Sequence, residues 1–363
     1  MTQMNISVII SCLKHCSMIY SLQSIRFILA LLIFHHHYFF NPHIEQFGTF
    51  PVAFFFILSG FLLSVGYTKK IHGESFSYRK FVLKRLVRIY PLNWIGLFLF
   101  LLYPILVVVY MGEFTAIKDL LLIPDLLLLQ SWCPYPSVYL SGNSVCWFLS
   151  DIVFCYLLFP FIIKNKNYLF HHGLFWLILS SYFVGVAIVK EEYIHGLIYI
   201  NPIFRLVDFV LGIRLFYFAN NLTHKNIVIS SINKSVIEFI VILISVLAMS
   251  IHRYVPTRIS CASLYWLPSM LLILVFTIHA KNGGGIFSKI FNLKGLVNLG
   301  SLSFPFYVFH VIIISWFWEV KSLLGINTFA GAFICIILNI FLSYMYMKYI
   351  EPPLNRKLSF LYE

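Results

Sequence analysis

One uninterrupted apolar stretch decides the fold class of this chain: Pro91-Leu-Asn-Trp-Ile-Gly-Leu-Phe-Leu-Phe-Leu-Leu-Tyr-Pro-Ile-Leu-Val-Val-Val-Tyr-Met111. These 21 residues contain no charged side chain. An α-helix rises about 1.5 Å per residue, so a segment of this length crosses the roughly 30 Å hydrocarbon core of a bilayer. Comparable stretches recur along all 363 residues. The sequence therefore predicts an all-α fold, a polytopic bundle of transmembrane helices.

The composition of the whole chain agrees with that prediction. Hydrophobic residues make up 60% of the sequence and charged residues only 11%, against about 25% charged residues in a soluble domain. A soluble protein needs a polar surface that this chain does not have the residues to build. The composition excludes a cytosolic enzyme, a secreted domain and a disordered protein.

Ten segments are apolar enough to be predicted as membrane spans. The segment at 203–218 is the least apolar, because it contains Arg205, Asp208 and Arg214. The ten predicted spans are 22–40, 50–68, 91–111, 144–163, 168–189, 203–218, 235–251, 259–280, 300–318 and 328–348.

The basic residues indicate how the bundle is oriented. The chain has 26 Lys and Arg against 13 Asp and Glu. If the N-terminus is cytoplasmic, twenty basic residues fall on the cytoplasmic side and six on the outer side. Cytoplasmic loops of membrane proteins are typically enriched in Lys and Arg, so this distribution favours a cytoplasmic N-terminus. An even number of spans also places the C-terminus in the cytoplasm. The excess positive charge thus indicates contact with anionic membrane lipid rather than with nucleic acid.

The first 17 residues do not fit the bundle. They contain no clear helix, and no small-residue cleavage site of a signal peptide follows them. Either Met18 is the native start or residues 1–17 are a poorly ordered extension, and we interpret 18–363 as a single integral-membrane domain.

The seven cysteines give no strong signal. Cys133 and Cys146 flank one outer loop, so a disulfide between them is one interpretation. Buried thiols are the interpretation that we favour. No spacing typical of metal ligands occurs, and no metal is expected.

Ionisable residues inside a bilayer are costly, so they are candidates for function. Arg26 precedes a run of three histidines, His35 to His37. His37 lies eleven positions after Arg26, a rotation of about 1100°, so the two share a helix face about 16 Å apart. His35 and His36 point elsewhere. A snorkelling arginine and an interfacial histidine belt are the alternative, but one arginine and one histidine on a single face favour a functional pair.

A second candidate is the basic segment from Lys69 to Arg88, which has seven Lys and Arg in twenty residues. Arg85 and Arg88 are spaced i,i+3 and share a helix face. Two guanidinium groups at the mouth of a span suit a phosphorylated ligand, because the planar fork binds phosphate oxygens in pairs. A plain positive-inside loop explains the spacing equally well.

Other polar residues within the spans have simpler interpretations. Arg205 and Asp208, also i,i+3, are expected to neutralise each other in the bundle interior. His310 is expected to form an interhelical hydrogen bond. Glu351 follows the last predicted span, where Lys348 could neutralise it.

Seven short motifs occur in one order along the chain. They are Arg26 and His37 with ten residues between them, Phe55-Phe-Ile-Leu-Ser59-Gly-Phe61, Arg85-Leu-Val-Arg88-Ile-Tyr-Pro91, Trp147-Phe-Leu-Ser150, Arg205 to Gly212, Leu299 to His310, and Glu351-Pro-Pro353. Together they resemble the acyltransferase-3 family of integral-membrane acyltransferases, over nearly the whole chain from Met18. The resemblance makes Ser59, Trp147, Ser150, Arg205, His310 and Glu351 further candidate site residues.

The resemblance implies transfer of an acyl group, usually acetyl, from cytoplasmic acyl-CoA to a hydroxyl of an extracytoplasmic glycan or lipid-linked sugar. It implies a location in the bacterial cytoplasmic membrane. Two departures stand out. Many members have Val-Glu after the Trp-Ser-Leu-Ser motif, where this chain has Asp151 and Ile152. Some members continue into a soluble SGNH-hydrolase-like domain, whereas we expect a stand-alone membrane domain here.

For this chemistry His37 is the candidate base for the acceptor hydroxyl, since an unperturbed histidine titrates near pH ~6.5. Arg26 would orient the donor, and Arg85 with Arg88 would bind its phosphates. Whether His37 takes a proton or itself carries the acyl group stays open. A transporter or flippase of lipid-linked sugars is the alternative function. A third interpretation, haem ligation, would pair His37 with His310.

Overall fold

The computed structural model describes residues 19–39, 44–111, 122–164, 168–223, 231–281 and 283–362. Within these ranges the chain is helical and contains no β-strand, which confirms the predicted all-α fold. The N-terminal extension and Met18 lie outside the described residues. So do Lys14, Lys118, Lys166 and Lys225, four of the basic residues from which the orientation is predicted.

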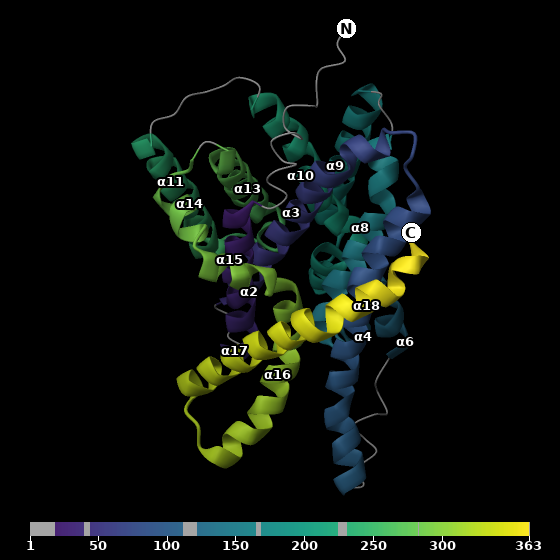
Figure 1. Ribbon diagram of the computed structural model, residues 1–363, viewed down its shortest axis with the longest axis vertical. Coiled ribbons are helices and arrows are strands. Elements are labelled where there is room, and N and C mark those ends of the chain that lie inside the picture. Colours follow the sequence, from purple (N-terminus) through teal and green to yellow (C-terminus); the bar gives the residue numbers. More distant parts are fainter. Residues whose placement is uncertain are drawn as a thin grey trace.

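Each of the ten predicted segments contains a helix (Figure 1). The main helices are α2 (Tyr20–Phe39), α3 (Gln46–Ile71), α4 (Tyr78–Met111), α6 (Leu122–Leu127), α8 (Trp147–Lys164), α9 (Tyr168–Ile188), α10 (Pro202–Thr223), α11 (Ser231–Ser250), α13 (Trp266–Lys281), α14 (Ile286–Phe291), α15 (Lys294–Ser301), α16 (Ser303–Leu324), α17 (Thr328–Met345) and α18 (Glu351–Leu358). Short helices α7 (Pro136–Tyr139) and α12 (Thr257–Ser260) lie in connections.

Length and apolarity allow six of the described helices to cross a membrane, or eight if two bent pairs each count as one span. The bent pairs are Glu191–Ile200 with Pro202–Leu222, and Lys294–Ser301 with Ser303–Trp318. The count of ten spans and the N-in, C-in orientation therefore remain predictions. Because it has this many long apolar helices, the protein is an integral membrane protein.

Helix α4 differs from its prediction at one end. The predicted span began at Pro91, but the helix begins at Tyr78 and includes the proline. Val87, Ile89 and Leu92 on either side of Pro91 are buried, so packing against the bundle compensates for the backbone hydrogen bond that proline removes. The basic residues Arg85 and Arg88 consequently lie on the same continuous helix as the apolar stretch.

The centre of the bundle is the crossing of α3 and α10. Glycines make this close crossing possible: a Cβ atom on Gly212 would lie 1.9 Å from the Ile57 carbonyl oxygen, and one on Gly60 would lie 2.0 Å from that of Phe209. Small residues that let helix backbones approach are typical of membrane bundles. The two glycines belong to two of the seven motifs, which therefore specify helix packing.

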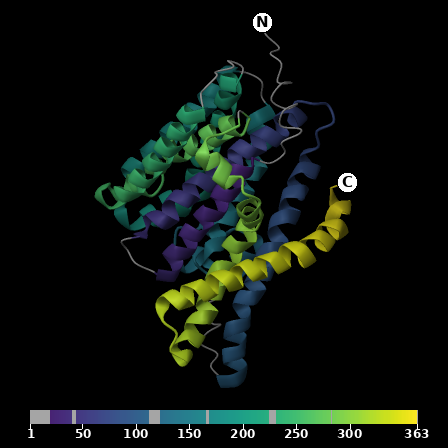
Figure 2. The same ribbon diagram turned by 60° about the vertical axis from the view of Figure 1, so that its left-hand side comes forward.

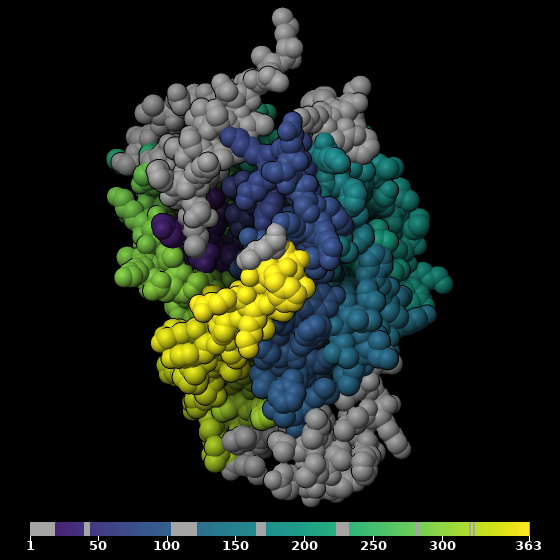
Figure 3. All heavy atoms as spheres, turned by 45° about the vertical axis from the view of Figure 1, so that its right-hand side comes forward, coloured from purple at the N-terminus to yellow at the C-terminus, as the bar shows by residue number. Residues whose placement is uncertain are grey.

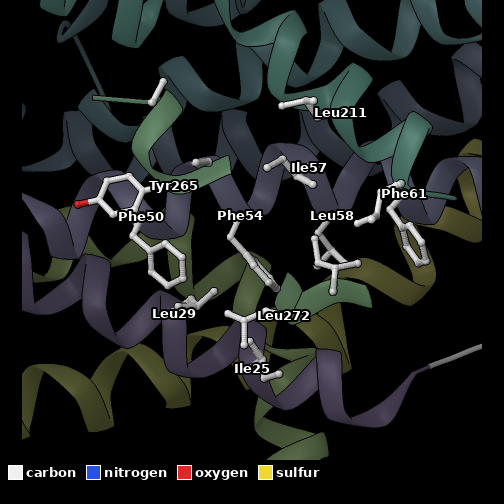
Figure 4. Close-up of a cluster of buried hydrophobic side chains, with 14 of the residues drawn as sticks. Ile25, Leu29, Phe50, Phe54, Ile57, Leu58, Phe61, Leu211, Tyr265 and Leu272 are labelled. Carbon is white, nitrogen blue, oxygen red and sulfur yellow. The ribbon is translucent and has the colours of Figure 1, made fainter. Parts of the chain in front are cut away.

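Helix α2 lies against α3 and positions the Arg26 and His37 side chains. Figure 4 shows Phe50, Phe54 and Leu58 of α3 among Ile25 and Leu29 of α2. At its other side α2 contacts α15, where the backbone at Gly300 approaches Gln23 so closely that a Cβ would not fit. The Ser24 hydroxyl also donates to the Phe291 carbonyl at 2.5 Å. Helix α2 is thus clamped between the core and the α14–α15 segment.

The C-terminal helices form an arm across the outside of the bundle (Figure 2). Helix α17 continues through a π-helical turn, Tyr346–Ile350, into α18. The arm lies across α4 in the space-filling view (Figure 3), and Lys84 of α4 lies over the ring of Tyr362. The exposed face of the arm is apolar, with Phe333 and Phe341 each more than half exposed, as a surface in contact with lipid requires.

Candidate functional site

A cavity of about 680 Å³ opens where α3 ends and α4 begins. Helices α2, α3, α4, α8 and α16 form its walls. Apolar side chains supply most of the lining, among them Phe55, Leu58, Leu62, Phe148, Leu149 and Phe304. A pocket of this size with apolar walls and a few polar groups is what a small-molecule site requires.

Four cationic side chains line this cavity: Arg26, Lys70, Arg85 and Arg88. Of the described residues that form the lining, none is Asp or Glu. Concentrated positive charge without a carboxylate partner attracts anions, and more strongly beside low-dielectric walls. Of the four predicted residues Arg26, His37, Arg85 and Arg88, the three arginines line this cavity. The structure adds Lys70 to them.

Aromatic rings hold Arg85 in place. Its guanidinium carbon lies 4.8 Å from the ring centre of Tyr67, 5.8 Å from that of Phe81 and 6.0 Å from that of Tyr156. Lys70 lies over the same Tyr67 ring, at 5.1 Å. Cation–π contacts restrict these side chains without using up their N–H donors. The donors of Arg85 thus stay available for an anionic ligand.

Arg26 and Ser59 also line the cavity. Arg26 donates to the Gln23 side chain at 3.4 Å, a weak bond within its own helix. The Ser59 hydroxyl donates to the Phe55 carbonyl at 2.7 Å, so in this state its proton is bound within α3. Arg26 is therefore held less firmly and is freer to meet a ligand.

His37 is not part of the cavity lining; it contacts His310 of α16. The Nδ1 atom of His37 lies 3.1 Å from Nε2 of His310, and the ring centres are 4.9 Å apart. The predicted interhelical hydrogen bond of His310 is thus present, with His37 as its partner. The predicted face shared by Arg26 and His37 does not bring these two side chains into contact.

Tyr307 lies between the cavity and the histidine pair. Its side chain lines the cavity, and its ring centre is 5.7 Å from that of His310. Its hydroxyl donates to the Val145 carbonyl at 2.7 Å. Tyr307 was not among the residues predicted from the sequence, although it stands three residues before His310 in one of the seven motifs. That spacing, one helical turn, was the signal available.

The other two histidines of the run point away from the pair, as the helical geometry predicted. His35 packs on Phe39 with ring centres 4.5 Å apart. His36 lies 3.3 Å from the Ile44 carbonyl through Nδ1. The haem interpretation stays a prediction; in this structure the two facing nitrogens of His37 and His310 are 3.1 Å apart, closer than the roughly 4 Å that a metal ion bound by both would need.

The described part of the chain contains no group of three or more His, Cys, Asp or Glu residues that could hold a metal ion. Cys133 and Cys146 are free thiols, and Cys146 is buried. The disulfide interpretation is therefore wrong and the buried-thiol interpretation of Cys146 is confirmed.

The comparisons with known proteins point to one family. A family model described as "Acyltransferase domain" of the acyltransferase-3 type matches residues 19–348. The chain belongs to the acyltransferase-3 family. Acyltransferase MdmB of Streptomyces mycarofaciens is 27% identical over 293 residues, which are 75% of this chain and 70% of that protein. No solved structure matches. The chain is therefore an acyltransferase, and the resemblance stated from its motifs is confirmed.

In this acyltransferase Arg205 and Asp208 form the predicted neutralised pair. Their side chains are 1% exposed and 2.7 Å apart. Arg205 also donates to the carbonyls of Tyr199 and Cys261, at 2.6 and 3.1 Å, and the Trp266 indole donates to Asp208. Arg205 lies outside the cavity lining, so its contacts link α10 to the segments before and after it.

Trp147, Ser150 and Asp151 lie on α8, whose neighbouring residues Phe148, Leu149 and Ile152 line the cavity. The Trp147 ring packs 5.2 Å from that of Tyr199. Ser150 accepts a hydrogen bond from Ser131 at 2.6 Å. Glu351 begins α18 and is outside the cavity lining. The structure thus separates these four residues from the site formed by the four cations.

Proposed function

We propose that this acyltransferase transfers an acyl group from acyl-CoA on the cytoplasmic side to a hydroxyl of an extracytoplasmic or lipid-linked glycan. We expect this acyl group to be acetyl. The bacterial cytoplasmic membrane is the proposed location. The observation that supports the donor is the cavity, whose lining combines four cations with apolar side chains. Coenzyme A has the same two-part chemistry, because its phosphate groups are anionic and its acyl-pantetheine arm is mostly apolar.

The donor would bind with its phosphates at Lys70, Arg85 and Arg88. Guanidinium groups bind phosphate oxygens in bidentate pairs, and the rings around Arg85 already hold its side chain in place. The pantetheine arm and the acyl group would extend past Arg26 along the apolar wall toward Tyr307. Tyr307 is also a neighbour of His310, so this path leads from the cations to the histidine pair.

The reaction needs a base at the inner end of that path. A sugar hydroxyl is a weak nucleophile, and a base that takes its proton during attack accelerates the reaction by about 10²- to 10⁴-fold. His37 is the proposed base. The hydroxyl oxygen forms a bond to the thioester carbonyl carbon, the C–S bond breaks, and the thiolate leaves with the proton that His37 took. In the alternative path His37 first carries the acyl group.

Loss of a single acyl increment from cell-surface glycans tests the proposal. Mass spectrometry would compare the glycans of cells with the gene, without it, and with the His37→Ala variant. We expect both the deletion and the variant to lose the increment, while His37→Ala still inserts in the membrane. Retention of the increment by His37→Ala would reject His37 as the reactive residue.

The transporter interpretation makes a different prediction for the same protein. A flippase moves a lipid-linked sugar without consuming acyl-CoA, whereas the proposed enzyme releases one free thiol for each acyl group transferred. Membership of the acyltransferase-3 family favours the enzyme. Thiol release from acetyl-CoA, measured with the purified protein and an envelope glycan fraction, distinguishes the two functions.

A further inference from the structure

We infer that His310 is a positioning residue that fixes the tautomer of His37 and so makes Nε2 of His37 the atom that takes the acceptor's proton. This inference rests on the proposed function, in which His37 is the base. It follows from a chain of four groups on α2 and α16: the Tyr307 carbonyl, the two imidazole rings and the Ile33 carbonyl.

The chain of hydrogen bonds starts at His310. Its Nδ1 lies 2.5 Å from the Tyr307 carbonyl oxygen. A carbonyl oxygen only accepts hydrogen bonds, so Nδ1 of His310 carries the hydrogen. His310 is 1% exposed and faces His37 rather than a carboxylate, and burial favours the neutral ring. In a neutral ring the second nitrogen, Nε2, then has a free lone pair and accepts.

The second ring continues the same logic. Nδ1 of His37 lies 2.9 Å from the Ile33 carbonyl oxygen and 3.1 Å from Nε2 of His310. Both neighbours are acceptors, so Nδ1 of His37 carries a hydrogen that the two share. Backbone N–H groups at helix termini often share one hydrogen between two acceptors in the same way. Nε2 of His37 is then the unprotonated nitrogen, and no described side chain or backbone group hydrogen-bonds to it.

The opposite tautomer does not fit these distances. With its hydrogen on Nε2, His37 would direct the Nδ1 lone pair at the Ile33 oxygen and at Nε2 of His310. Unpaired acceptors that face each other in a buried site lose hydrogen bonds and repel. The contact with the Tyr307 carbonyl likewise prevents His310 from turning its own hydrogen toward His37. The two backbone carbonyls thus select one tautomer for both rings.

His310 would act before and during proton transfer. When Nε2 of His37 takes the hydroxyl proton, the ring becomes positive, and its Nδ1 hydrogen already has two acceptors that stabilise that charge. As the C–S bond breaks, the thiolate takes this proton from Nε2 of His37, so both imidazole rings begin and end the cycle neutral. This role matches that of the aspartate in a Ser-His-Asp triad, which orients the histidine without being protonated, but with a neutral partner.

Two amide variants that differ by one methylene group test the inference. In His310→Gln the side-chain oxygen can reach the position of Nε2 and accept from His37, whereas in His310→Asn it is too short. His310→Leu removes the acceptor and keeps a similar volume. His35→Gln serves as the control, because it makes the same substitution in the histidine run at a residue that packs on Phe39 and Phe47.

The assay uses the purified full chain, acetyl-CoA as the donor and the envelope glycan fraction of cells that lack the gene as the acceptor. We expect His310→Leu and His310→Asn to lower kcat about 100-fold with little change in KM for acetyl-CoA. We expect the kcat of His310→Gln to stay within about tenfold of the wild-type value. The kcat of His35→Gln should equal that of wild type.

Three outcomes separate this inference from the proposed function. If wild type transfers no acetyl group, the proposed function fails and the inference fails with it. If wild type is active, His37→Ala is inactive and His310→Leu keeps the wild-type kcat, only the inference is overturned. Equal losses in His310→Gln and His310→Asn would also overturn it, because a merely structural role does not depend on whether the amide can reach His37.

Discussion

Arg85 illustrates how one side chain can be prepared for a ligand before the ligand arrives. The rings of Tyr67, Phe81 and Tyr156 surround its guanidinium, so little side-chain entropy remains to be lost on binding. We expect Arg85→Gln to raise KM for acyl-CoA about 10- to 100-fold, because a hydrogen bond to a charged group contributes about 1.5–3 kcal/mol. We expect kcat to change little, since the phosphates do not react.

The control for Arg85→Gln lies on the same helix. Arg79 is exposed and outside the cavity lining, so Arg79→Gln removes the same charge from α4 without touching the site. KM measured by thiol release should stay at the wild-type value in this control. An equal rise of KM in both variants would mean that general surface charge, rather than the cavity, attracts the donor.

The buried carboxyl group of Asp125 should make the stability of the folded protein depend on pH. Burial raises the pKa of this carboxyl from 3.8 to about 7, although a hydrogen bond from the Ser141 hydroxyl opposes the shift. Gly142 makes this burial possible: its φ is +55°, and a Cβ there would lie 2.2 Å from the carboxylate. The folded state therefore holds a proton between pH ~4 and ~7 that the unfolded state has released.

Because the folded state binds more protons in that window, stability is highest below pH ~4 and falls as the pH rises to ~7. The change amounts to about 4 kcal/mol at most for a shift of this size. Unfolding in detergent from pH 4.5 to 8 should show this slope in wild type, and Asp125→Asn should flatten it. A slope unchanged by the substitution would place its origin in another group.

Residue chemistry was predictable wherever it depended on one helix. Helical spacing alone placed Arg85 with Arg88, and Arg205 with Asp208, and it separated His37 from His35 and His36. The contact between His37 and His310 was not predictable in this way, because 273 residues separate the two. Nothing local fixes which turn of α16 faces α2; the packing of both helices against their neighbours determines it.

At the scale of elements, the crossing of α3 and α10 holds the cavity wall in place. The backbones touch at Gly60 and Gly212, and the nearest atoms are carbonyl oxygens that cannot move aside. We expect Gly212→Ala to cost about 3 kcal/mol of stability, the upper end for an overpacked core. The measurement is the thermal unfolding midpoint of the purified protein.

Gly66, another glycine of α3, provides the matched control. A Cβ on Gly66 would meet no atom within 4 Å, so Gly66→Ala should leave stability unchanged or raise it by up to about 1 kcal/mol through helix propensity. If Gly66→Ala proved as harmful as Gly212→Ala, backbone flexibility rather than the close crossing would explain why these positions are glycine.

Apolarity predicted where helices occur, but it did not predict their ends. Pro91 was taken as the start of a span, yet α4 continues through it because both flanks are buried. The last helix likewise continues beyond the predicted span, through Tyr346–Ile350 into α18. Helix ends depend on tertiary packing, which compensates for a lost hydrogen bond, and the sequence pattern of one segment does not contain that information.

At the scale of the whole molecule, the distribution of basic residues predicts which face is cytoplasmic. Lys289 of α14 is exposed and belongs to the predicted inner side, and Tyr254 is 73% exposed on the predicted outer side. In a background without the native cysteines, an impermeant maleimide should label Tyr254→Cys in intact cells and Lys289→Cys only in inverted vesicles. The reverse pattern would invert the topology.

The same orientation decides from which side the donor reaches its site. Lys70, Arg85 and Arg88 lie near the end of α3 and the start of α4, and the positive-inside pattern predicts that this end faces the cytoplasm. Acyl-CoA is anionic and does not cross a bilayer. Acetyl-CoA added outside should therefore be consumed by inverted membrane vesicles and not by right-side-out vesicles, as measured by thiol release.

Detergent provides the control for this last experiment, because it exposes both faces and should give the two vesicle preparations equal rates. The Arg85→Gln variant should reduce the rate of inverted vesicles at low acetyl-CoA and approach wild type at saturation, since it weakens binding rather than chemistry. Consumption by intact right-side-out vesicles would place the cation-lined end outside. That result would contradict a cytoplasmic donor even if every cavity substitution behaved as expected, because sidedness depends on the topology of the whole bundle and not on the site alone.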